Sequence, residues 1–484
     1  MVNPQRSLFK WGPVEGRPLY VGIWGDTLKG PGRKNKKDYP WPWPSMVAAF
    51  QDGKIVGIVE YNILEQTGQK YFIKYFLNKK NYQLLWSRWE RWVLESRKII
   101  SFLEAVDVKR LSDKDLLLLY EITYVCMDAL WCIVHIPEIA NWGGEKILYD
   151  SLKKIDANKA EDYLETLSAL TKLSFTQQEE LDLLRLALIK NKKKRLNAFL
   201  KHAELYRLLL SNYAGSKILS EQYFEKKVKR LSSRSDVQKR IRKIEGRMID
   251  AQKKKRALVK NVGLSKNVQF TAEQLSNSIW WQDLRKMYIW RMQFYTDKLV
   301  KEIAWRNNWK FNDIVWCWPW EVTQLAQRQK LDYKKIISRA KVYCWVSGKE
   351  KVKEYYGKQA ESLLKKYDSR VSQSIKEVRG LVVSRGNGYN VRGAVKIIRD
   401  PFKDQKKMKK GDILVAPMTS PEFVILMRKA AAVVTDTGGM TSHAAVVSRE
   451  LGIPCLVRTG AATKVFKDGD IVEVNTKTGT VKKV

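Results

Sequence analysis

The chain has 484 residues, of which 44% are hydrophobic and 29% are charged, and this globular balance excludes a long disordered protein. The length exceeds one compact core, so we expect two or three domains. The net charge of +39 is spread along the chain, since roughly ten of these charges follow Lys376. It would attract anionic partners such as phosphorylated metabolites, nucleotides or nucleic acid. Lysine-rich solvated surfaces are the plainer explanation.

The five cysteines are odd in number and scattered without a C-x-x-C pair, so neither a disulfide framework nor a metal site is expected. The first 20 residues lack the apolar core of a signal peptide. The longest apolar stretch, around Tyr124 to Ile136, is interrupted by Asp128 and is too short to span a bilayer. The sequence therefore predicts a cytoplasmic protein with no membrane partner.

Residues 1–95 are predicted to form a small mixed α/β region. The Trp-Pro cluster from Pro40 to Pro44 is incompatible with a helix, because proline forces the preceding residue into extended geometry. Lys54 to Tyr61 and Gln69 to Phe76 are apolar and β-prone, and they are predicted to pair as a hairpin.

Residues 96–368 are predicted to form a helical domain. Ser112 and Asp113 are good capping residues ahead of an apolar run that reaches Ile136. The 3.6-residue hydrophobic period continues in four further segments, namely Leu196 to Tyr213, Val237 to Val262, Ala272 to Trp305 and Tyr333 to Ser347. The many tryptophans of this region are expected to pack between helices.

The pattern changes near Lys376, after a predicted linker from Ser369, and residues 376–484 are predicted to form a separate α/β unit. Its predicted strands are Val378 to Ser384, Tyr389 to Ile398, Asp412 to Ala416, Ala431 to Val434, Cys455 to Val457, Ile471 to Val474 and Thr480 to Val484. A helix should end at Leu451, where Gly452 and Pro454 follow. The fold class is therefore a multidomain α+β protein, largely helical before this C-terminal unit.

The loop Thr435-Asp436-Thr437-Gly438-Gly439-Met440-Thr441-Ser442-His443 has the features of a phosphoryl carrier. Gly438 and Gly439 would let a bulky anion approach the backbone. Thr441 or Ser442 would cap the helix, which places His443 in a first turn whose free N–H groups favour negative charge. A neutral imidazole can attack phosphorus.

Other polar groups of the same segment are candidates to assist His443. The hydroxyls of Thr441 and Ser442 could hydrogen-bond the phosphoryl oxygens. Arg449, on the same helix, could neutralise their charge.

The segment TDTGGMTSHAAVVSRELGIPCLV, residues 435–457, resembles the phosphohistidine signature of phosphoenolpyruvate synthase, pyruvate phosphate dikinase and rifampicin phosphotransferase. The flanks GDILVAPMTSPEF and DGDIVEVNTKTGTV are similar to the same mobile domain, so the resemblance covers about residues 376–484. It implies a swivelling β/β/α domain in which His443 takes a phosphoryl group at one site and delivers it at another.

Two features of that family are not found in this sequence. Neither the glycine-rich and acidic signals of an ATP-grasp domain nor the phosphoenolpyruvate-binding barrel is recognisable. We therefore expect no cofactor bound by a recognisable motif. A separate ATP-grasp or phosphoenolpyruvate-binding partner would supply the phosphoryl group, with Mg²⁺ accompanying ATP or phosphoenolpyruvate.

An acceptor site in the helical domain is a further hypothesis. Tyr124, Asp128 and His135 fall on one face of a predicted helix, and Asp128 could serve as the general base for an acceptor hydroxyl. A polar seam in a bundle is more often structural. His202 beside Tyr206 is expected to be a packed core pair.

The leading functional prediction is a phosphotransferase component, an enzyme of phosphoryl transfer in which His443 is the carrier between a partner and an unknown acceptor. The alternative is a basic nucleic-acid-binding or scaffolding protein with a relic phosphohistidine domain, although the lysine runs on separate helices favour only weak nucleic-acid binding. A self-sufficient kinase with an unrecognised nucleotide site is a third possibility.

Overall fold

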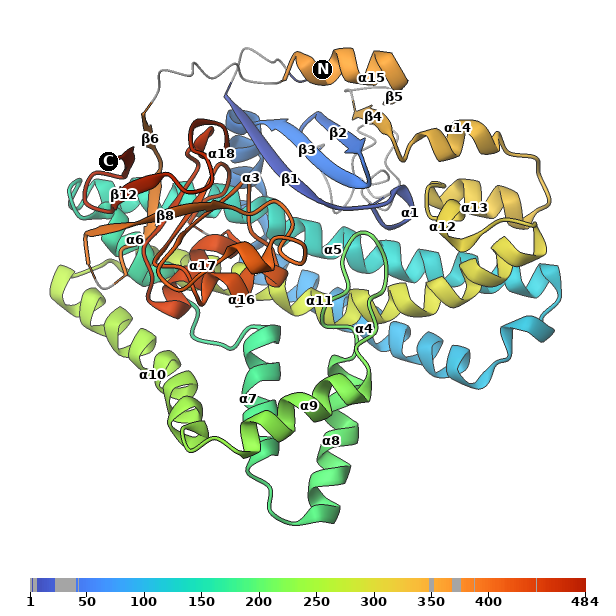
Figure 1. Cartoon of the computed structure of the whole chain (residues 1–484), viewed down its shortest axis with the longest axis horizontal. Helices are drawn as coiled ribbons and strands as arrows, with labels where there is room; N and C mark the ends of the chain where they lie inside the picture. The colour runs from blue at the N-terminus through green and yellow to red at the C-terminus, as the bar shows by residue number, and fades with distance from the viewer. Residues whose placement is uncertain are drawn as a thin grey trace.

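The computed structural model describes residues 2, 7–21, 41, 43–347, 352–367, 376–386, 388–440 and 442–484 (Figure 1). The α-helices are α1 (Pro18–Val21), α3 (Tyr61–Tyr75), α4 (Lys79–Ala105), α5 (Asp113–Lys153), α6 (Ala160–Ser168), α7 (Phe175–Ala187), α8 (Lys192–Tyr206), α9 (Glu221–Ser232), α10 (Val237–Val262), α11 (Lys266–Arg306), α12 (Phe311–Ile314), α13 (Pro319–Ala326), α14 (Tyr333–Ser338), α15 (Gly357–Lys365), α16 (Val424–Met427), α17 (His443–Leu451) and α18 (Ala462–Val465).

The strands are β1 (Leu8–Glu15), β2 (Met46–Gln51), β3 (Lys54–Glu60), β4 (Val342–Ser347), β5 (Val352–Tyr356), β6 (Glu377–Arg379), β7 (Leu381–Ser384), β8 (Asn390–Ile397), β9 (Ile413–Ala416), β10 (Ala432–Thr435), β11 (Cys455–Val457), β12 (Ile471–Asn475) and β13 (Thr480–Lys483). Residues 369–375 of the predicted linker, Pro40 and Pro42 of the Trp-Pro cluster, and Thr441 lie outside the described residues.

A five-stranded antiparallel sheet, in the order β1-β3-β2-β4-β5, joins distant parts of the chain. Its strand β4 pairs with β2, for example Val346 with Val47. The prediction of a helix from Tyr333 to Ser347 is therefore only half right, since the helix ends at Ser338. All six residues of β4 are buried, and a short continuous apolar run has no period that separates a strand from a helix.

The hairpin predicted from Lys54 to Phe76 is wrong, because β3 pairs with β2 instead. The two strands turn at Asp52 and Gly53, whose φ values of 49° and 75° are those of a two-residue Asp-Gly hairpin. The second predicted strand lies in the helix α3, whose buried residues recur every three or four positions, at Leu64, Gly68, Tyr71, Phe72 and Tyr75.

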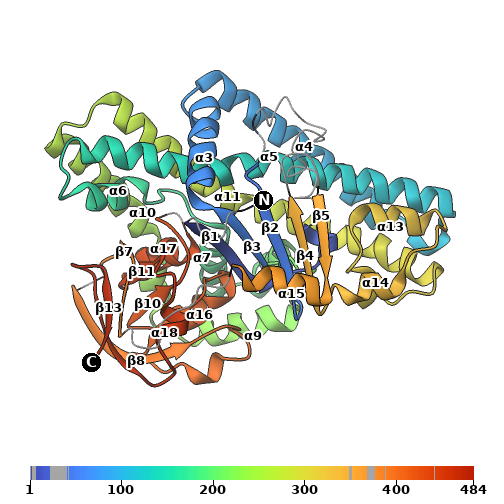
Figure 2. The ribbon, with the colours of Figure 1, turned by 90° about the horizontal axis from the view of Figure 1, so that it is seen from above.

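The helices α5 and α11 run side by side beneath this sheet and form the centre of the molecule (Figures 1 and 2). As predicted, Ser112 caps α5, and its hydroxyl accepts a hydrogen bond from the amide of Asp115. By length and composition alone α5 could cross a membrane, contrary to the sequence estimate. It is packed against α3, α4 and α11, which is the environment of a core helix.

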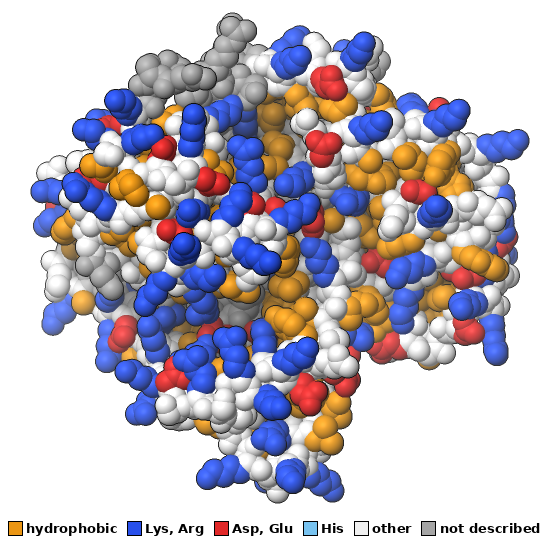
Figure 3. Space-filling model, in the orientation of Figure 1, with side chains coloured by type: hydrophobic (Ala, Val, Ile, Leu, Met, Phe, Trp, Pro, Cys, Tyr) orange, Lys and Arg blue, Asp and Glu red, His pale blue; other side chains and the backbone are white. Residues whose placement is uncertain are grey.

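The helices α7, α8, α9 and α10 form an arm that extends from the body and has small hydrophobic cores of its own (Figure 1). As expected, His202 packs on Tyr206 there, with ring centroids 4.7 Å apart. Lys and Arg side chains are scattered over the arm and the rest of the same face of the molecule, in agreement with a dispersed positive charge (Figure 3).

The C-terminal residues from Glu377 onward form an eight-stranded sheet in the order β6-β13-β12-β8-β9-β10-β11-β7. The four strands β8, β9, β10 and β11 are parallel, and the remaining neighbours are antiparallel. Six of the predicted strands of this unit are present within one or two residues. The strand predicted from Val378 to Ser384 is wrong as a single strand, because it divides at Gly380 into β6 and β7, which lie at opposite edges of the sheet.

This unit rests against the helices in both views (Figures 1 and 2). Ion pairs join it to the helical body: Arg385 lies 2.7 Å from Asp162 of α6, and Arg428 lies 2.8 Å from Glu180 of α7. The amide of Met440 also donates to Glu145 of α5 at 3.3 Å. These contacts direct the loop before α17 towards α5 and α11.

Candidate functional site

The site begins where the adjacent parallel strands β9 and β10 end. Their carboxyl ends meet at one edge of the sheet, which is where open α/β sheets form their ligand crevices. Thr419 follows β9, and the loop from Asp436 to His443 follows β10. The sheet therefore brings together two segments about 20 residues apart in the sequence.

The loop after β10 is held in one conformation by its own contacts. The Asp436 carboxylate accepts hydrogen bonds from the Thr459 hydroxyl at 3.3 Å and from the amide and hydroxyl of Thr463. Gly438 has a φ of 126°, which L-residues rarely adopt, and a Cβ there would lie 3.0 Å from the Ser442 hydroxyl. Only glycine fits this turn without displacing the cap of the next helix.

The helix α17 begins at His443, with Ser442 as its N-cap. The Ser442 hydroxyl accepts a hydrogen bond from the amide of Ala445 at 3.3 Å. Gly452, in the left-handed conformation with φ 69°, ends the helix, as predicted. His443 thus occupies the first helical position, where the positive end of the helix dipole favours an anion.

His443 is held at one ring nitrogen. Its Nδ1 lies 2.9 Å from the hydroxyl of Thr419. When Nδ1–H donates to that hydroxyl, Nε2 carries the lone pair and is the nucleophilic nitrogen. Burial, with Lys286 nearby, lowers the pKa of His443 to about 3, so the imidazole is neutral at cell pH.

A cavity of about 240 Å³ faces His443 from the helical body. On its far wall Lys286 and Asp283 of α11 form an ion pair at 2.7 Å. Burial alone would raise the pKa of Asp283, but Lys286 and the amide of Phe175 hold it below its ordinary value. The cavity therefore brings together the carboxylate of Asp283, the ammonium group of Lys286 and the imidazole of His443.

A second ion pair lies beside the first. Arg285 of α11 contacts Glu138 of α5 at 2.5 Å, and Glu138 lines the same cavity. Glu450 of α17 also lines it, and burial together with the charge of Asp283 raises the pKa of Glu450 to about 8. A protonated Glu450 could donate a hydrogen bond to an anion at neutral pH.

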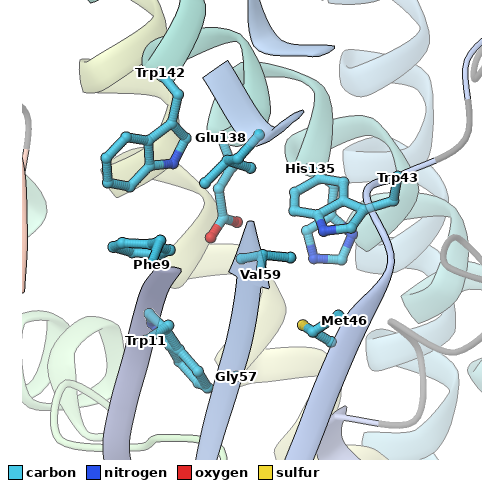
Figure 4. A pocket seen from close by; sticks show the side chains of 10 residues that line it. Phe9, Trp11, Trp43, Met46, Gly57, Val59, His135, Glu138 and Trp142 are labelled. Carbon is cyan, nitrogen blue, oxygen red and sulfur yellow. The ribbon is translucent and has the colours of Figure 1, made fainter. Parts of the chain in front are cut away.

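His135 does not line this cavity but an adjoining one, between α5 and the five-stranded sheet (Figure 4). Burial lowers the pKa of His135 to about 4, so it too is neutral. Phe9, Trp11, Glu138 and Trp142 line both cavities and so form the boundary between them.

The other two predicted acceptor residues lie elsewhere. Tyr124 stacks near Tyr120, with centroids 6.3 Å apart, and Asp128 accepts a hydrogen bond from the Cys132 thiol at 3.8 Å. Neither lines a described cavity that contains His443. Asp128 shares a helical face with His135 but lies about 10 Å from it along the axis, and it lines neither the cavity of His135 nor that of His443.

Arg449 also lies away from His443. Its Nε donates to the carbonyl of Val383 at 2.8 Å, and Glu165 lies 4.0 Å away, at the edge of a different cavity. Six residues of helix leave the two side chains about 120° apart around the axis, so they point to different faces.

Sequence reasoning missed Thr419, Asp283, Lys286 and Glu138. Nothing local to Thr419 indicates a histidine partner. The sequence holds a weak signal for Asp283 and Lys286. These two charged residues are three positions apart and lie inside the aromatic stretch between Trp280 and Trp290. Among the residues that the structure describes, no group of three or more His, Cys, Asp and Glu could hold a metal ion.

Residues 408–479 match the family described as PEP-utilising enzyme, mobile domain. A probable phosphoenolpyruvate synthase of Staphylothermus marinus is 51% identical over 113 residues, 23% of this chain and 13% of that protein. The phosphoenolpyruvate synthase of Pyrococcus furiosus is 52% identical over 106 residues, 22% of this chain and 12% of its own. The phosphoenolpyruvate synthase of Pseudomonas aeruginosa is 35% identical over 167 residues, which are 33% of this chain and 20% of that protein.

These matches confirm the resemblance stated from the signature residues, over the C-terminal part of the chain. The matched stretch spans between 12 and 20% of the length of the relatives named above. A solution NMR structure of a UPF0107 protein matches 22% of this chain and 98% of its own at 17% identity, with a TM-score of 0.17.

Proposed function

We propose that this chain is a phosphotransferase component in which His443 carries a phosphoryl group from a separate donor protein to an acceptor bound between α5 and α11. One observation supports this most directly: a neutral imidazole, fixed at Nδ1 by Thr419, faces a cavity walled by Lys286 and Asp283. The phosphohistidine-type sequence around it gives the imidazole its role.

In the first half-reaction Nε2 of His443 attacks the phosphorus of the donor. The new N–P bond forms as the donor's P–O bond breaks, and the leaving oxygen keeps the electron pair. The helix dipole of α17 stabilises the phosphoryl charge on the imidazole.

In the second half-reaction an acceptor hydroxyl attacks the same phosphorus. The N–P bond breaks and its electrons return to Nε2, while the hydroxyl proton passes to the carboxylate of Asp283 as general base. Lys286 lies 2.7 Å from that carboxylate and would stabilise the transferring phosphoryl oxygens.

The docked arrangement suits delivery to the acceptor. The loop of His443 is held to α5 by the Met440–Glu145 hydrogen bond, and His443 lines the cavity that the helical body forms. Loading would then require residues 376–484 to move away as a domain and meet a partner that handles ATP or phosphoenolpyruvate with Mg²⁺.

A labelling experiment tests the proposal. The wild-type chain is incubated with an extract that supplies the donor and with radiolabelled ATP or phosphoenolpyruvate, and acid-labile, base-stable label is measured. We expect label on the wild type and on a His202→Asn control, since His202 lies in the arm, but none on His443→Gln.

Equal labelling of His443→Gln would overturn the proposal. Absence of label from wild type with both donors would favour the alternative of a relic domain in a binding or scaffolding protein.

A further inference from the structure

The cavity that His443 lines has balanced charges on its walls. Among the described residues that line it, the cations are Arg285 and Lys286, and each has a carboxylate partner. Glu138 lies 2.5 Å from Arg285, and Asp283 lies 2.7 Å from Lys286. A buried charge without a partner is strongly unfavourable, so these pairings leave no spare cation for the carboxylate of an acceptor.

The other ionisable groups of the wall add no charge near neutral pH. Burial raises the pKa of Glu450 to about 8 and lowers the pKa of His443 to about 3, so both are uncharged. In the proposed transfer Lys286 already stabilises the phosphoryl oxygens. An acceptor with a carboxylate or phosphate of its own would add a negative charge that no unpaired described cation of this wall balances. The charge balance therefore favours a neutral acceptor.

Uncharged hydrogen-bonding groups line the same cavity. The Nδ2 of Asn141 donates to the Oε1 of Gln282 at 2.9 Å, and the Nε2 of Gln282 has no acceptor among the described residues. The hydroxyls of Ser174 and Thr176 lie 3.2 Å apart and belong to the same wall. A purely apolar occupant would remove water from these groups without replacing its hydrogen bonds. They favour an acceptor with several hydroxyl groups.

The size of this cavity and its aromatic walls favour a ring. An apolar cavity of about 150 Å³ holds benzene, so a cavity of about 240 Å³ has room for a six-membered ring with its substituents. Phe9, Trp11 and Trp142 line it and are only partly buried, and the rings of Phe9 and Trp142 meet with centroids 4.5 Å apart. Aromatic faces beside a few fixed polar groups are typical of ligand pockets.

We propose that the acceptor is a neutral polyhydroxylated ring, of the class of sugars and cyclic polyols, bound in this cavity between Gln282 and the aromatic walls with one hydroxyl beside Asp283 and His443. This deepens the proposed function and rests on it. Gln282 is then a specificity residue, because its amide binds ring hydroxyls and takes no part in the transfer. The pairing of Lys286 with Asp283 disfavours acceptors that carry a carboxylate.

Calorimetric titration of the full chain without a donor tests this with three kinds of six-membered ring. Glucose, galactose, mannose and myo-inositol are the neutral polyols. Quinate carries a carboxylate in addition to its hydroxyls, and cyclohexanol has a single hydroxyl. At least one neutral polyol should bind at least about tenfold more tightly than both quinate and cyclohexanol.

Two variants test the residues that carry the inference. Gln282→Leu should weaken binding of the preferred polyol by about tenfold, whereas the matched control Gln252→Leu, at an exposed position of α10, should not. Asp283→Asn should tighten the binding of quinate by about tenfold, because Lys286 then lacks its carboxylate partner. A variant that failed to fold would not gain binding in this way.

The inference fails if no neutral polyol binds more tightly than quinate and cyclohexanol, if Gln282→Leu keeps full affinity, or if quinate gains nothing from Asp283→Asn. Because this binding needs no donor, the result separates from labelling of His443. Labelled His443 without polyol preference overturns only the acceptor class, whereas polyol preference in a chain that never labels overturns the proposed function.

Discussion

Thr419 and His443 stand on loops that follow neighbouring parallel strands, and the Thr419 hydroxyl lies 2.9 Å from Nδ1 of the imidazole. This hydrogen bond selects the tautomer with a free lone pair on Nε2 if Nδ1–H is the donor. It also orients the ring towards Lys286 and Asp283.

Thr419→Val should therefore slow phosphorylation of His443 by about 10- to 100-fold, since the isosteric change removes the acceptor that fixes the tautomer. Thr419→Ser should restore most of the rate, because it keeps the hydroxyl. Initial rates of acid-labile labelling measure both variants. A Thr419→Val rate equal to that of the wild type would show that Thr419 does not position the ring.

The lowered pKa values of His443 and His135 predict a pH dependence of stability. The unfolded chain binds a proton at each histidine below about pH 6.5, while the native imidazoles stay neutral down to about 3 and about 4. The unfolded state thus takes up more protons, so the free energy of unfolding falls as the pH drops below 6.5, by about 1.4 kcal/mol per unit for each histidine.

NMR of ¹⁵N-histidine-labelled protein between pH 8 and 5 checks this directly, and His443→Gln identifies the resonance. The His443 ring should not titrate in that range. A titration midpoint near pH 6.5 would show that burial and the neighbouring Lys286 do not lower the pKa of His443.

Asp283→Asn and Lys286→Met should leave labelling of His443 intact but slow the transfer of the label to an acceptor by roughly 100-fold or more. The measurement is the decay of purified phosphorylated protein after an acceptor is added. Lys301→Met, an exposed lysine of α11, is the matched control. Unchanged decay in both cavity variants would exclude this wall from the transfer step.

Removing two of the ion pairs between the C-terminal unit and the helices should loosen the docking. Partly exposed pairs contribute about 0–1 kcal/mol each, so Asp162→Asn combined with Glu180→Gln should raise the undocked population by up to about 30-fold. Hydrogen exchange of residues 438–446 should accelerate. Asp107→Asn, which removes an exposed pair with Arg110, should have no such effect.

Gly143→Ala should destabilise the protein severely, by about 3 kcal/mol or more. The helices α3 and α5 touch there, and a Cβ on Gly143 would lie 1.8 Å from the amide nitrogen of Gln69. Gly246→Ala is the control: it lies in α10 with nothing within 4 Å, so it should stabilise by about 0.5–1 kcal/mol. Thermal denaturation compares the two variants.

Much of the C-terminal unit could be predicted from the sequence because its signals are local. Ser442 caps α17 and Gly452 ends it, and both effects depend on a few adjacent residues. The proposed role of His443 as a carrier likewise rests on a contiguous signature.

The predictions that were wrong concern elements whose packing partners lie far away in the chain. Gln69 to Phe76 has β-prone residues, yet contact with α5 at Gly68 and Gly143 makes the segment a helix face. The strand Val342–Ser347 needed β2, nearly 300 residues earlier, to complete its hydrogen bonds.

The sequence by itself determined the capping and chemistry of the His443 loop, since backbone conformation and imidazole reactivity are set by neighbouring residues. Only the tertiary structure decided what the imidazole faces. Lys286 and Asp283 come from α11, Glu138 from α5 and Trp11 from β1, and these distant segments meet because burying α5 and α11 under one sheet minimises exposed apolar surface.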